Sequence, residues 1–315
     1  GIGFSYIRNA VLVLRGESMR YYISIDIGGT SIKYGLLDEE GRILEKSSID
    51  TEAHRGAAAI LEKAGRIIDL YREKQEISGI CISTAGMVDC EKGEIFYSGE
   101  LIPHYTGTPF KKVLEETYGI PCEVENDVNC AGLAEYKNGA ASGSRVAVCL
   151  TLGTGIGGCI LIDGKVFHGF SSSACEIGYM NMYGSDFQTL GASSILSKNV
   201  AEKKQEDPKV WPGIRIFEEA GRGDAVCIAS IEHMAEILGE GIANICYVMN
   251  PEVVVLGGGI AAQEAYLKPL VTNQLRRFLK PVIFEKTRLE FAKQRNDAGM
   301  LGAFYHFQMR RQECS

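Results

Sequence analysis

The chain has 315 residues, of which 45% are hydrophobic and 23% are charged, and its net charge is −7. This balance is typical of a folded protein with a full core, and the length favours two domains. The acidic charge argues against a nucleic-acid partner, and no apolar run approaches the roughly 20 residues needed to cross a bilayer. We therefore expect a cytoplasmic protein with neither a nucleic-acid nor a membrane partner.

The N-terminal segment is expected to contribute little to the fold. Its apolar run "AVLVL" is flanked by Arg8 and Arg15 and is too short for the core of a signal peptide. Met19 has the character of a natural start. We therefore expect residues 1–18 to be a disordered or non-native extension.

Strands and helices alternate along the first part of the chain. Apolar runs and turn residues predict strands at 21–28, 31–38, 41–49, 77–83 and 121–125. Helical spacing is found at 56–74 and around 109–118, and the segment 126–140 is expected to open as a loop and continue as a helix. This order is typical of an α/β domain.

The pattern then restarts. The stretch "VAVCLTLGTGIGGCILIDGKVF" has the same layout as "YYISIDIGGTSIKYGLLDEEGRIL". Asp26 aligns with Thr151 and Gly28 with Gly153, at a constant offset of 125 residues. Each copy is an apolar strand, a Gly/Thr turn and a second apolar strand that ends in Asp. We interpret this as an internal duplication.

Beyond the second copy, residues 198–213 have a mixed composition that predicts a surface excursion. A long helical pattern follows over 224–248, and the strand 252–256 runs into three glycines. The ten cysteines show no C-x-x-C spacing, and several lie within apolar runs such as "GICIS". We therefore predict reduced, buried thiols rather than disulfides or a metal site.

The two glycine turns are the first candidate site. A hairpin turn without side chains lets backbone amides approach phosphate oxygens, and Thr30 and Thr154 add hydroxyl donors. The alternative is that the glycines only make tight hairpins. Asp26 ends an apolar strand, where a magnesium ion held through water would balance its charge, unless the carboxylate caps its own turn.

Three further motifs carry polar chemistry. Asn126 and Asp127 follow a short strand, where an aspartate could accept the proton of an attacking hydroxyl, or where both could simply cap the next helix. Glu176 lies in an apolar, small-residue stretch and is suited to accept hydrogen bonds from sugar hydroxyls. The run Gly257, Gly258 and Gly259 could receive a nucleotide at a helix N-terminus, although it is also a generic strand–helix junction.

These motifs resemble the ROK family (repressors, open reading frames and sugar kinases) of the actin-like ATPase superfamily. The resemblance covers residues 20 to about 307 and includes "DIGGTSIKYGLLD", "ISTAGMVD", "ENDVNCAGLAE", "LTLGTGIGGCILIDGKV", "EIGYM" and "VVVLGGGIA". It implies a duplicated ribonuclease H-like, actin-like ATPase fold with two α/β domains around a central cleft. The smaller domain would span 19–125 with about 290–315, and the larger one 126–289.

The resemblance also implies ATP- and magnesium-dependent phosphorylation of a hexose 6-hydroxyl, with Asp127 as general base. It assigns sugar contacts to Gly86, Asn126 and Glu176, and the adenosine side to Gly257, Gly258 and Gly259. Phosphate and magnesium contacts fall on Asp26, Gly28, Gly29, Thr30, Lys33, Thr154 and Gly155. A homodimer is the family-like expectation.

The departures from the family pattern bear on the substrate. Tyr179 stands at the position of the family's histidine, no cysteine cluster follows it, and Gln188 replaces a sugar-binding glutamate. We therefore predict no zinc site and a substrate pocket, including Tyr179 and Gln188, that tolerates a substituent at C1 of the sugar. Zinc-lacking β-glucoside kinases look similar, so the expected substrate is a β-glucoside or glucose.

Other interpretations stay open at this point. The substrate could be N-acetylmannosamine or fructose, as in other kinases of the family. The protein could be a sugar-responsive transcriptional regulator, although the segment before "DIGGT" is too short for a DNA-binding module. An actin-like structural ATPase is a third possibility, but such a protein has no use for Asn126, Asp127 and Glu176.

Overall fold

The computed structural model describes residues 19–313, so the predicted extension at 1–18 lies outside the described residues. The chain divides into two compact units, which we call unit 1 and unit 2. Unit 1 runs to Cys130 and resumes at Gly299, and unit 2 spans Ala131–Ala298. The predicted domain ranges, with limits at 125 and about 290, stay a prediction.

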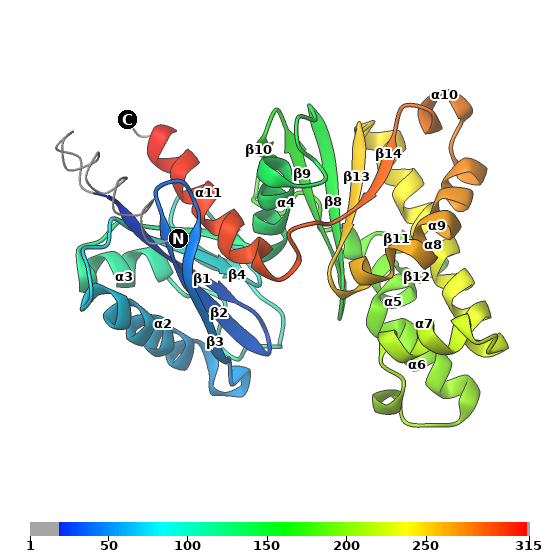
Figure 1. Ribbon diagram of the computed structural model, residues 1–315, viewed down its shortest axis with the longest axis horizontal. Coiled ribbons are helices and arrows are strands. Elements are labelled where there is room, and N and C mark those ends of the chain that lie inside the picture. Colours follow the sequence, from blue (N-terminus) through cyan, green and yellow to red (C-terminus); the bar gives the residue numbers. More distant parts are fainter. Residues whose placement is uncertain (1–18, 314–315) are drawn as a thin grey trace, which may run out of the picture. The chain divides into compact units, whose positions relative to one another are not determined.

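Unit 1 is built on a five-stranded sheet (Figure 1). Its first three strands are antiparallel and the other two run parallel to the first strand. The order across the sheet is β3 (Ile43–Asp50), β2 (Ser31–Asp38), β1 (Tyr21–Ile27), β4 (Gly79–Thr84) and β7 (Cys122–Asn126). A small hairpin of β5 (Met87–Asp89) and β6 (Glu94–Tyr97) lies between β4 and β7 in the chain.

Unit 2 repeats this sheet. Its strand order is β10 (Lys165–Val166), β9 (Ile156–Ile162), β8 (Val146–Leu152), β13 (Val253–Gly257) and β14 (Arg288–Phe291), with two antiparallel pairings followed by two parallel ones, as in unit 1. Strand β8 (Val146–Leu152) starts and ends 125 residues after β1 (Tyr21–Ile27). The matching topology confirms the predicted internal duplication and the α/β fold class.

Helices cover the sheets. In unit 1 they are α2 (Gly56–Arg72), α3 (Phe110–Tyr118), the first turn of α4 (Asp127–Asn138) and α11 (Ala298–Glu313). In unit 2, besides the rest of α4, they are α5 (Phe187–Gly191), α6 (Ser193–Lys204), α7 (Gly213–Gly221), α8 (Ala225–Met249), α9 (Glu264–Phe278) and α10 (Pro281–Phe284). Helix α4 begins directly after β7, so the loop predicted at the start of 126–140 is absent.

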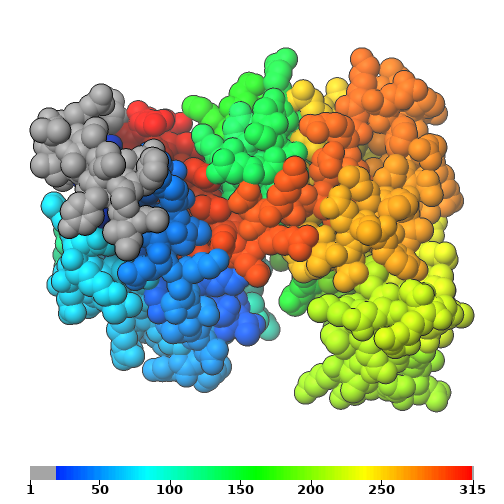
Figure 2. All heavy atoms as spheres, in the orientation of Figure 1, coloured from blue at the N-terminus to red at the C-terminus, as the bar shows by residue number. Residues whose placement is uncertain are grey.

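The surface excursion predicted at 198–213 is confirmed for residues 205–210, which are all exposed, whereas Val200, Ala201 and Trp211 are buried. Helix α6 continues to Lys204, and Val200 is fully buried. Trp211 is only 3% exposed, because its ring lies under Lys204 and Arg215 and its indole N–H donates to Glu206. In the space-filling view the yellow-green atoms of this region form a solid lobe of unit 2 (Figure 2). The segment is therefore an exposed connection that is anchored to unit 2 by one buried tryptophan.

Strand alternation in β1 decides which side chains meet α11. The isoleucines at 23, 25 and 27 pack with α2 and α3, and the intervening residues point to α11. Tyr22 makes edge contacts with Phe304 and Phe307, and the Ser24 hydroxyl donates to the Met300 carbonyl at 2.7 Å. The next residue on this face is Asp26. Helix α11 therefore covers the face of the sheet to which Ser24 and Asp26 belong (Figure 1).

The sequence also predicted that no segment spans a membrane and that the cysteines are reduced and buried. Within residues 19–313, no helix is both long and apolar enough to span a membrane. The nine cysteines in this range are free; eight are buried and Cys175 is partly exposed. The prediction of reduced, buried thiols is thus confirmed for most of the described cysteines.

Candidate active site

The Asp26 carboxylate lies at the end of β1 on the face that meets α11. The Ser83 hydroxyl of β4 donates to its Oδ1 at 2.8 Å, and Lys33 is its cross-strand partner on β2. Burial raises the pKa of Asp26, while the Ser83 hydrogen bond and the Lys33 charge act in the opposite direction. A partly buried carboxylate in these surroundings is suited to hold a magnesium ion through the water molecules bound to that ion.

Gly299 closes the other side of Asp26, a contact that the sequence alone did not indicate. A Cβ atom at Gly299 would lie 2.3 Å from the carboxylate Cγ, so only glycine leaves room. Gly299 is in the first turn of the 16-residue helix α11. The positive end of a helix dipole stabilises an anion at this place. The carboxylate is therefore fixed by Ser83 and by the start of α11.

Asn126 organises the junction between β7 and α4. Its Oδ1 accepts hydrogen bonds from the backbone amides of Val128 at 2.9 Å and Asn129 at 3.1 Å, which is the geometry of a helix N-cap. Its Nδ2 donates to the carbonyl of Gly86 at 2.8 Å. Gly86 has a φ of 97°, a left-handed conformation that favours glycine. The structure thus brings together two of the predicted sugar-binding residues, Asn126 and Gly86.

Asp127 is the first residue of α4, and its Oδ1 accepts the Val128 amide at 2.9 Å. The phenol of Tyr105 is buried, and burial together with the charge of Asp127 raises its pKa. The Tyr105 and Thr84 hydroxyls are 2.5 Å apart. Tyr105 and Thr84 therefore form a buried hydroxyl pair in unit 1, which sequence patterns did not reveal.

The first glycine turn is held by Thr51, which lies between β3 and α2. The Thr51 hydroxyl donates to the Gly28 carbonyl at 2.7 Å, and the Thr51 amide donates to the Thr30 carbonyl at 2.9 Å. A Cβ at Gly29 would lie 2.6 Å from the Leu101 side chain. Thr30 itself is exposed. Both hydrogen bonds from Thr51 end on carbonyl oxygens of the turn. They therefore hold the turn while leaving its solvent-exposed side, at Thr30, uncovered.

The second glycine turn and the glycine run after β13 share one cavity of about 350 Å³ in unit 2. It is lined by the second glycine turn, including Thr154 and Gly155, by Gly258 and Gly259 of the glycine run, and by Gln188. Gly258 has a φ of 84°, and a Cβ there would lie 2.4 Å from the Leu152 carbonyl oxygen. Glycine at this position is thus required both by conformation and by space.

The second turn also has a hydroxyl brace. The Ser194 amide donates to the Gly153 carbonyl at 3.1 Å, and its hydroxyl donates to the Thr154 carbonyl at 2.8 Å. Ser194 thus donates an amide and a hydroxyl hydrogen bond to carbonyls of this turn, as Thr51 does in the first turn. The sequence repeat extends to neither residue. The duplicated hairpins are therefore held in the same way by unrelated segments.

Gln188 lies against the second turn rather than pointing into solvent. Its Oε1 accepts the Ile156 amide at 3.4 Å, and Cβ atoms at Gly155 or Gly178 would each lie 2.6 Å from that oxygen. Gly178 belongs to the single turn of helix at Ile177–Tyr179 that follows Glu176. Gln188 therefore joins the glycine turn to the segment that carries Glu176.

Glu176 and Tyr179 are both exposed on the surface of unit 2. The Tyr179 side chain is 55% exposed, although it stands in a segment whose neighbours Ile177 and Gly178 are buried. Partial desolvation raises the pKa of Glu176. A carboxylate and an aromatic ring are thus exposed three residues apart on the surface of unit 2.

Replacing Gln188 with Ala is expected to raise the KM for ATP about tenfold. The variant loses the hydrogen bond to the Ile156 amide and the packing against Gly155 and Gly178. The KM for the sugar is expected to change by less than about twofold, since the side chain faces the turn. Steady-state kinetics with each substrate varied in turn measures both values. An increase confined to the sugar KM would instead support the original assignment of Gln188 to sugar binding.

Comparison with known proteins agrees with the motif pattern. The model of the ROK family matches residues 22–310. The chain belongs to the ROK family. The α/β fold predicted for it is thereby identified as the duplicated actin-like ATPase fold of ROK kinases.

Two curated relatives and one solved structure illustrate the similarity. A β-glucoside kinase of Listeria monocytogenes is 30% identical over 90% of this chain and 96% of its own length. A glucokinase of Halalkalibacterium halodurans is 29% identical over 90% and 94%. The structure of a ROK family glucokinase from Streptomyces griseus in complex with glucose and AMPPNP is 27% identical, covers 92% of this chain and 99% of that one, and has a TM-score of 0.77.

The candidate residues fall into one group in each unit. Unit 1 contains the first glycine turn, Lys33, Asp26, Gly86, Asn126 and Asp127. Unit 2 contains the second glycine turn, the run Gly257–Gly259, Glu176, Tyr179 and Gln188. The functional assignments of these residues remain predictions.

Proposed function

We propose that this protein is an ATP-dependent sugar kinase that transfers the γ-phosphoryl group to the 6-hydroxyl of a hexose. The observation that carries the proposal is the β7–α4 junction. There Asp127 starts a helix whose N-cap, Asn126, is tied to Gly86. The ROK relatives named glucokinase and β-glucoside kinase support the reaction class.

In the proposed reaction Asp127 accepts the proton of the sugar hydroxyl. The hydroxyl oxygen forms a bond to the γ-phosphorus, the bond from that phosphorus to the β–γ bridging oxygen breaks, and ADP leaves. Asn126 would orient the sugar in unit 1, and Glu176 would accept sugar hydroxyl hydrogen bonds in unit 2. The role of the protein is then mainly positioning and charge stabilisation.

The nucleotide would use both glycine turns. The cavity lined by Thr154, Gly155 and Gly258 suits the phosphates and adenosine of ATP, since its walls are mostly backbone. Asp26 and Lys33 would hold the magnesium–phosphate part, and the fit rests on the partly buried Asp26 carboxylate described above. When bound, magnesium neutralises phosphate charge.

A β-glucoside is the proposed substrate, with glucose as the second candidate. Gln188 directs its oxygen at the Ile156 amide, so this side chain does not supply an acceptor to the anomeric end of a sugar. The exposed Tyr179 ring offers an apolar face on which the second ring of a disaccharide could lie. Both features favour a site that accepts a substituent at C1.

A phosphorylation assay tests the substrate. ATP-dependent product formation is measured for cellobiose, a methyl β-glucoside, glucose, N-acetylmannosamine and fructose, and the product is analysed for a 6-phosphate. We expect kcat/KM for at least one β-glucoside to equal or exceed that for glucose. We also expect Tyr179→Ala to lower the disaccharide value several-fold more than the glucose value.

Two results would contradict parts of this proposal. A strong preference for free glucose or N-acetylmannosamine would refute the β-glucoside assignment but leave the kinase assignment in place. No phosphorylation of any sugar, together with tight sugar binding, would instead favour the sugar-responsive regulator.

A further inference from the structure

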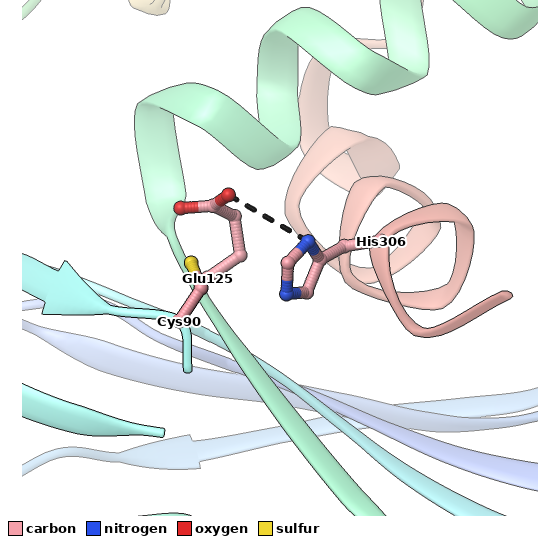
Figure 3. Close-up of side chains that lie close together, drawn as sticks. All are labelled: Cys90, Glu125 and His306. Atoms are coloured by element: carbon pink, nitrogen blue, oxygen red, sulfur yellow. Dashed lines mark ion pairs between the residues drawn. The ribbon is translucent and has the colours of Figure 1, made fainter. Parts of the chain in front are cut away.

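Apart from the candidate active-site residues, unit 1 contains three side chains close together whose types commonly bind metal ions: a cysteine, a glutamate and a histidine. Cys90 follows β5, Glu125 lies on β7 and His306 lies in the middle of α11. One ligand atom from each lies within 4.8 Å of the others. The three residues are 8%, 0% and 5% exposed. Figure 3 shows the thiol, the carboxylate and the imidazole pointing toward one another.

The spacing of two of these groups suits a shared ion. His306 Nδ1 and Glu125 Oε2 are 3.6 Å apart. This distance is longer than the roughly 2.7–3.2 Å of an N–H···O hydrogen bond. Two ligands of one tetrahedral zinc ion, with metal–ligand bonds of about 2.0–2.3 Å, lie roughly 3.5 Å from each other.

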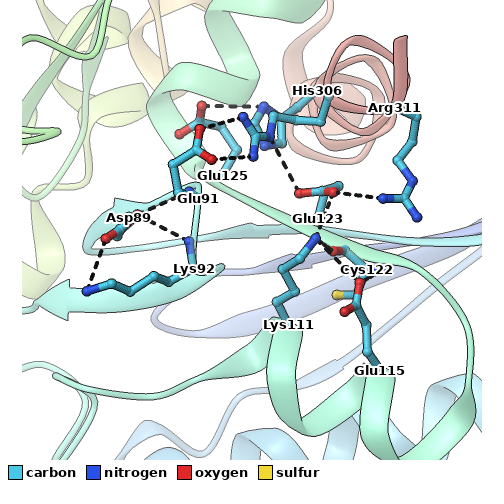
Figure 4. A network of polar contacts seen from close by, with 11 residues as sticks. Asp89, Glu91, Lys92, Lys111, Glu115, Cys122, Glu123, Glu125, His306 and Arg311 are labelled. Atoms are coloured by element: carbon cyan, nitrogen blue, oxygen red, sulfur yellow. Dashed lines mark hydrogen bonds and ion pairs between the residues drawn. The ribbon is translucent and has the colours of Figure 1, made fainter. Parts of the chain in front are cut away.

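The neighbouring carboxylate on the same strand has a different set of partners. Glu123 contacts three cations, at 2.8 Å from Lys111, 3.5 Å from Arg311 and 3.7 Å from Arg310 (Figure 4). Glu125 instead faces a thiol and the imidazole of His306, with which it forms an ion pair when the imidazole is protonated. In the metal-free site burial raises the pKa of the Cys90 thiol, and Glu125 is the hydrogen-bond partner of that thiol. A divalent ion that replaced the thiol proton would meet a thiolate and a carboxylate, whose two negative charges would balance its charge.

The other oxygen of Glu125 is already oriented. Oε1 accepts the Asn126 amide at 2.7 Å and the Asn129 side-chain amide at 3.1 Å. Such hydrogen bonds fix a ligating carboxylate and direct its second oxygen toward the metal. Through Asn126 the same carboxylate is connected to the start of α4, where Asp127 lies.

We propose that Cys90, Glu125 and His306 bind one divalent transition-metal ion of the zinc class. The combination of thiolate, imidazole and carboxylate suits zinc or cobalt and does not suit magnesium, which prefers oxygen ligands. The site is separate from the magnesium assignment at Asp26. A bound ion ties α11 to β7 and stabilises the junction that carries Asp127. The expectation of no zinc site would then hold only for the segment after Tyr179.

Metal titration of the full chain tests this site. The purified protein is stripped with a chelator, dialysed and titrated with Co²⁺ and then with Zn²⁺. We expect one equivalent of Co²⁺ to produce a thiolate-to-cobalt charge-transfer absorption that Zn²⁺ removes and excess Mg²⁺ does not. Cys90→Ala should abolish this absorption and weaken Zn²⁺ binding more than about 100-fold, because losing even a supporting residue costs about 10- to 100-fold.

Two variants serve as controls. Cys122→Ala removes another buried thiol of the same hydrophobic core and should leave the absorption unchanged. His306→Gln should weaken Zn²⁺ binding but keep the thiolate absorption. Zn²⁺ should raise the melting temperature of the wild type and of Cys122→Ala but not of Cys90→Ala.

The wild-type protein alone can overturn the proposal, whatever the folding of the variants. If Co²⁺ produces no thiolate absorption in the wild type, the three residues form a metal-free polar cluster. Equal Zn²⁺ affinity in the wild type and in a folded Cys90→Ala variant would mean that only an adventitious ion binds.

Discussion

Asp127→Asn is expected to lower kcat for sugar phosphorylation by about 10³-fold, within the range of 10² to 10⁴ that general base catalysis contributes. Asparagine keeps the size and the Val128 hydrogen bond of the aspartate but cannot accept the hydroxyl proton. The KM for ATP should stay within about twofold. A coupled assay for ADP measures both constants.

A second aspartate provides the control. Asp207 also accepts a backbone amide at a turn, that of Lys209 at 2.8 Å, but lies on an exposed part of unit 2. Asp207→Asn should leave kcat unchanged. If Asp127→Asn retained more than about a tenth of wild-type kcat, Asp127 would not be the base.

Gly299→Ala is expected to reduce kcat/KM for magnesium–ATP by about 10²-fold, the scale of a roughly 1 Å misplacement of a catalytic group. The new methyl carbon would lie 2.3 Å from the Asp26 carboxylate, which must then move away from Ser83 or push α11 outward. Such overpacking also destabilises the fold by about 1–3 kcal/mol. Kinetics at varied magnesium concentration and thermal unfolding measure the two effects.

Gly221→Ala is the matched control. Gly221 also lies in a helix, but a Cβ there would meet nothing within 4 Å. The substitution should leave activity unchanged and raise stability by up to about 1 kcal/mol, because alanine is the better helix former. Equal activity of the Gly299 and Gly221 variants would show that the position of Asp26 does not matter for catalysis.

The local parts of the fold were predictable from the sequence. The offset of 125 residues reflects strands that the structure indeed duplicates, since β1 and β8 have the same length and the same pairing. Asn126 and Asp127 could be singled out because they follow an apolar strand. Such features depend on residues that are close together in the chain.

The supporting contacts could not be predicted, because they join distant parts of the chain. Gly299 meets Asp26 only because α11 returns to cover β1, and the spacing of glycines does not reveal this contact. Cys90, Glu125 and His306 lie on three elements far apart in sequence, so no ligand-spacing pattern could suggest a site. Gln188 likewise shows its contact with Gly155 only in three dimensions.

Hexose-dependent ADP formation by the purified full-length chain is the most direct test of the central claim that this protein is a sugar kinase. The assay follows ADP and the sugar 6-phosphate together, with and without magnesium, across glucose and β-glucosides. We predict one ADP for each sugar 6-phosphate formed, and almost none of either without sugar. ADP formation at the same rate with and without every sugar would contradict the claim.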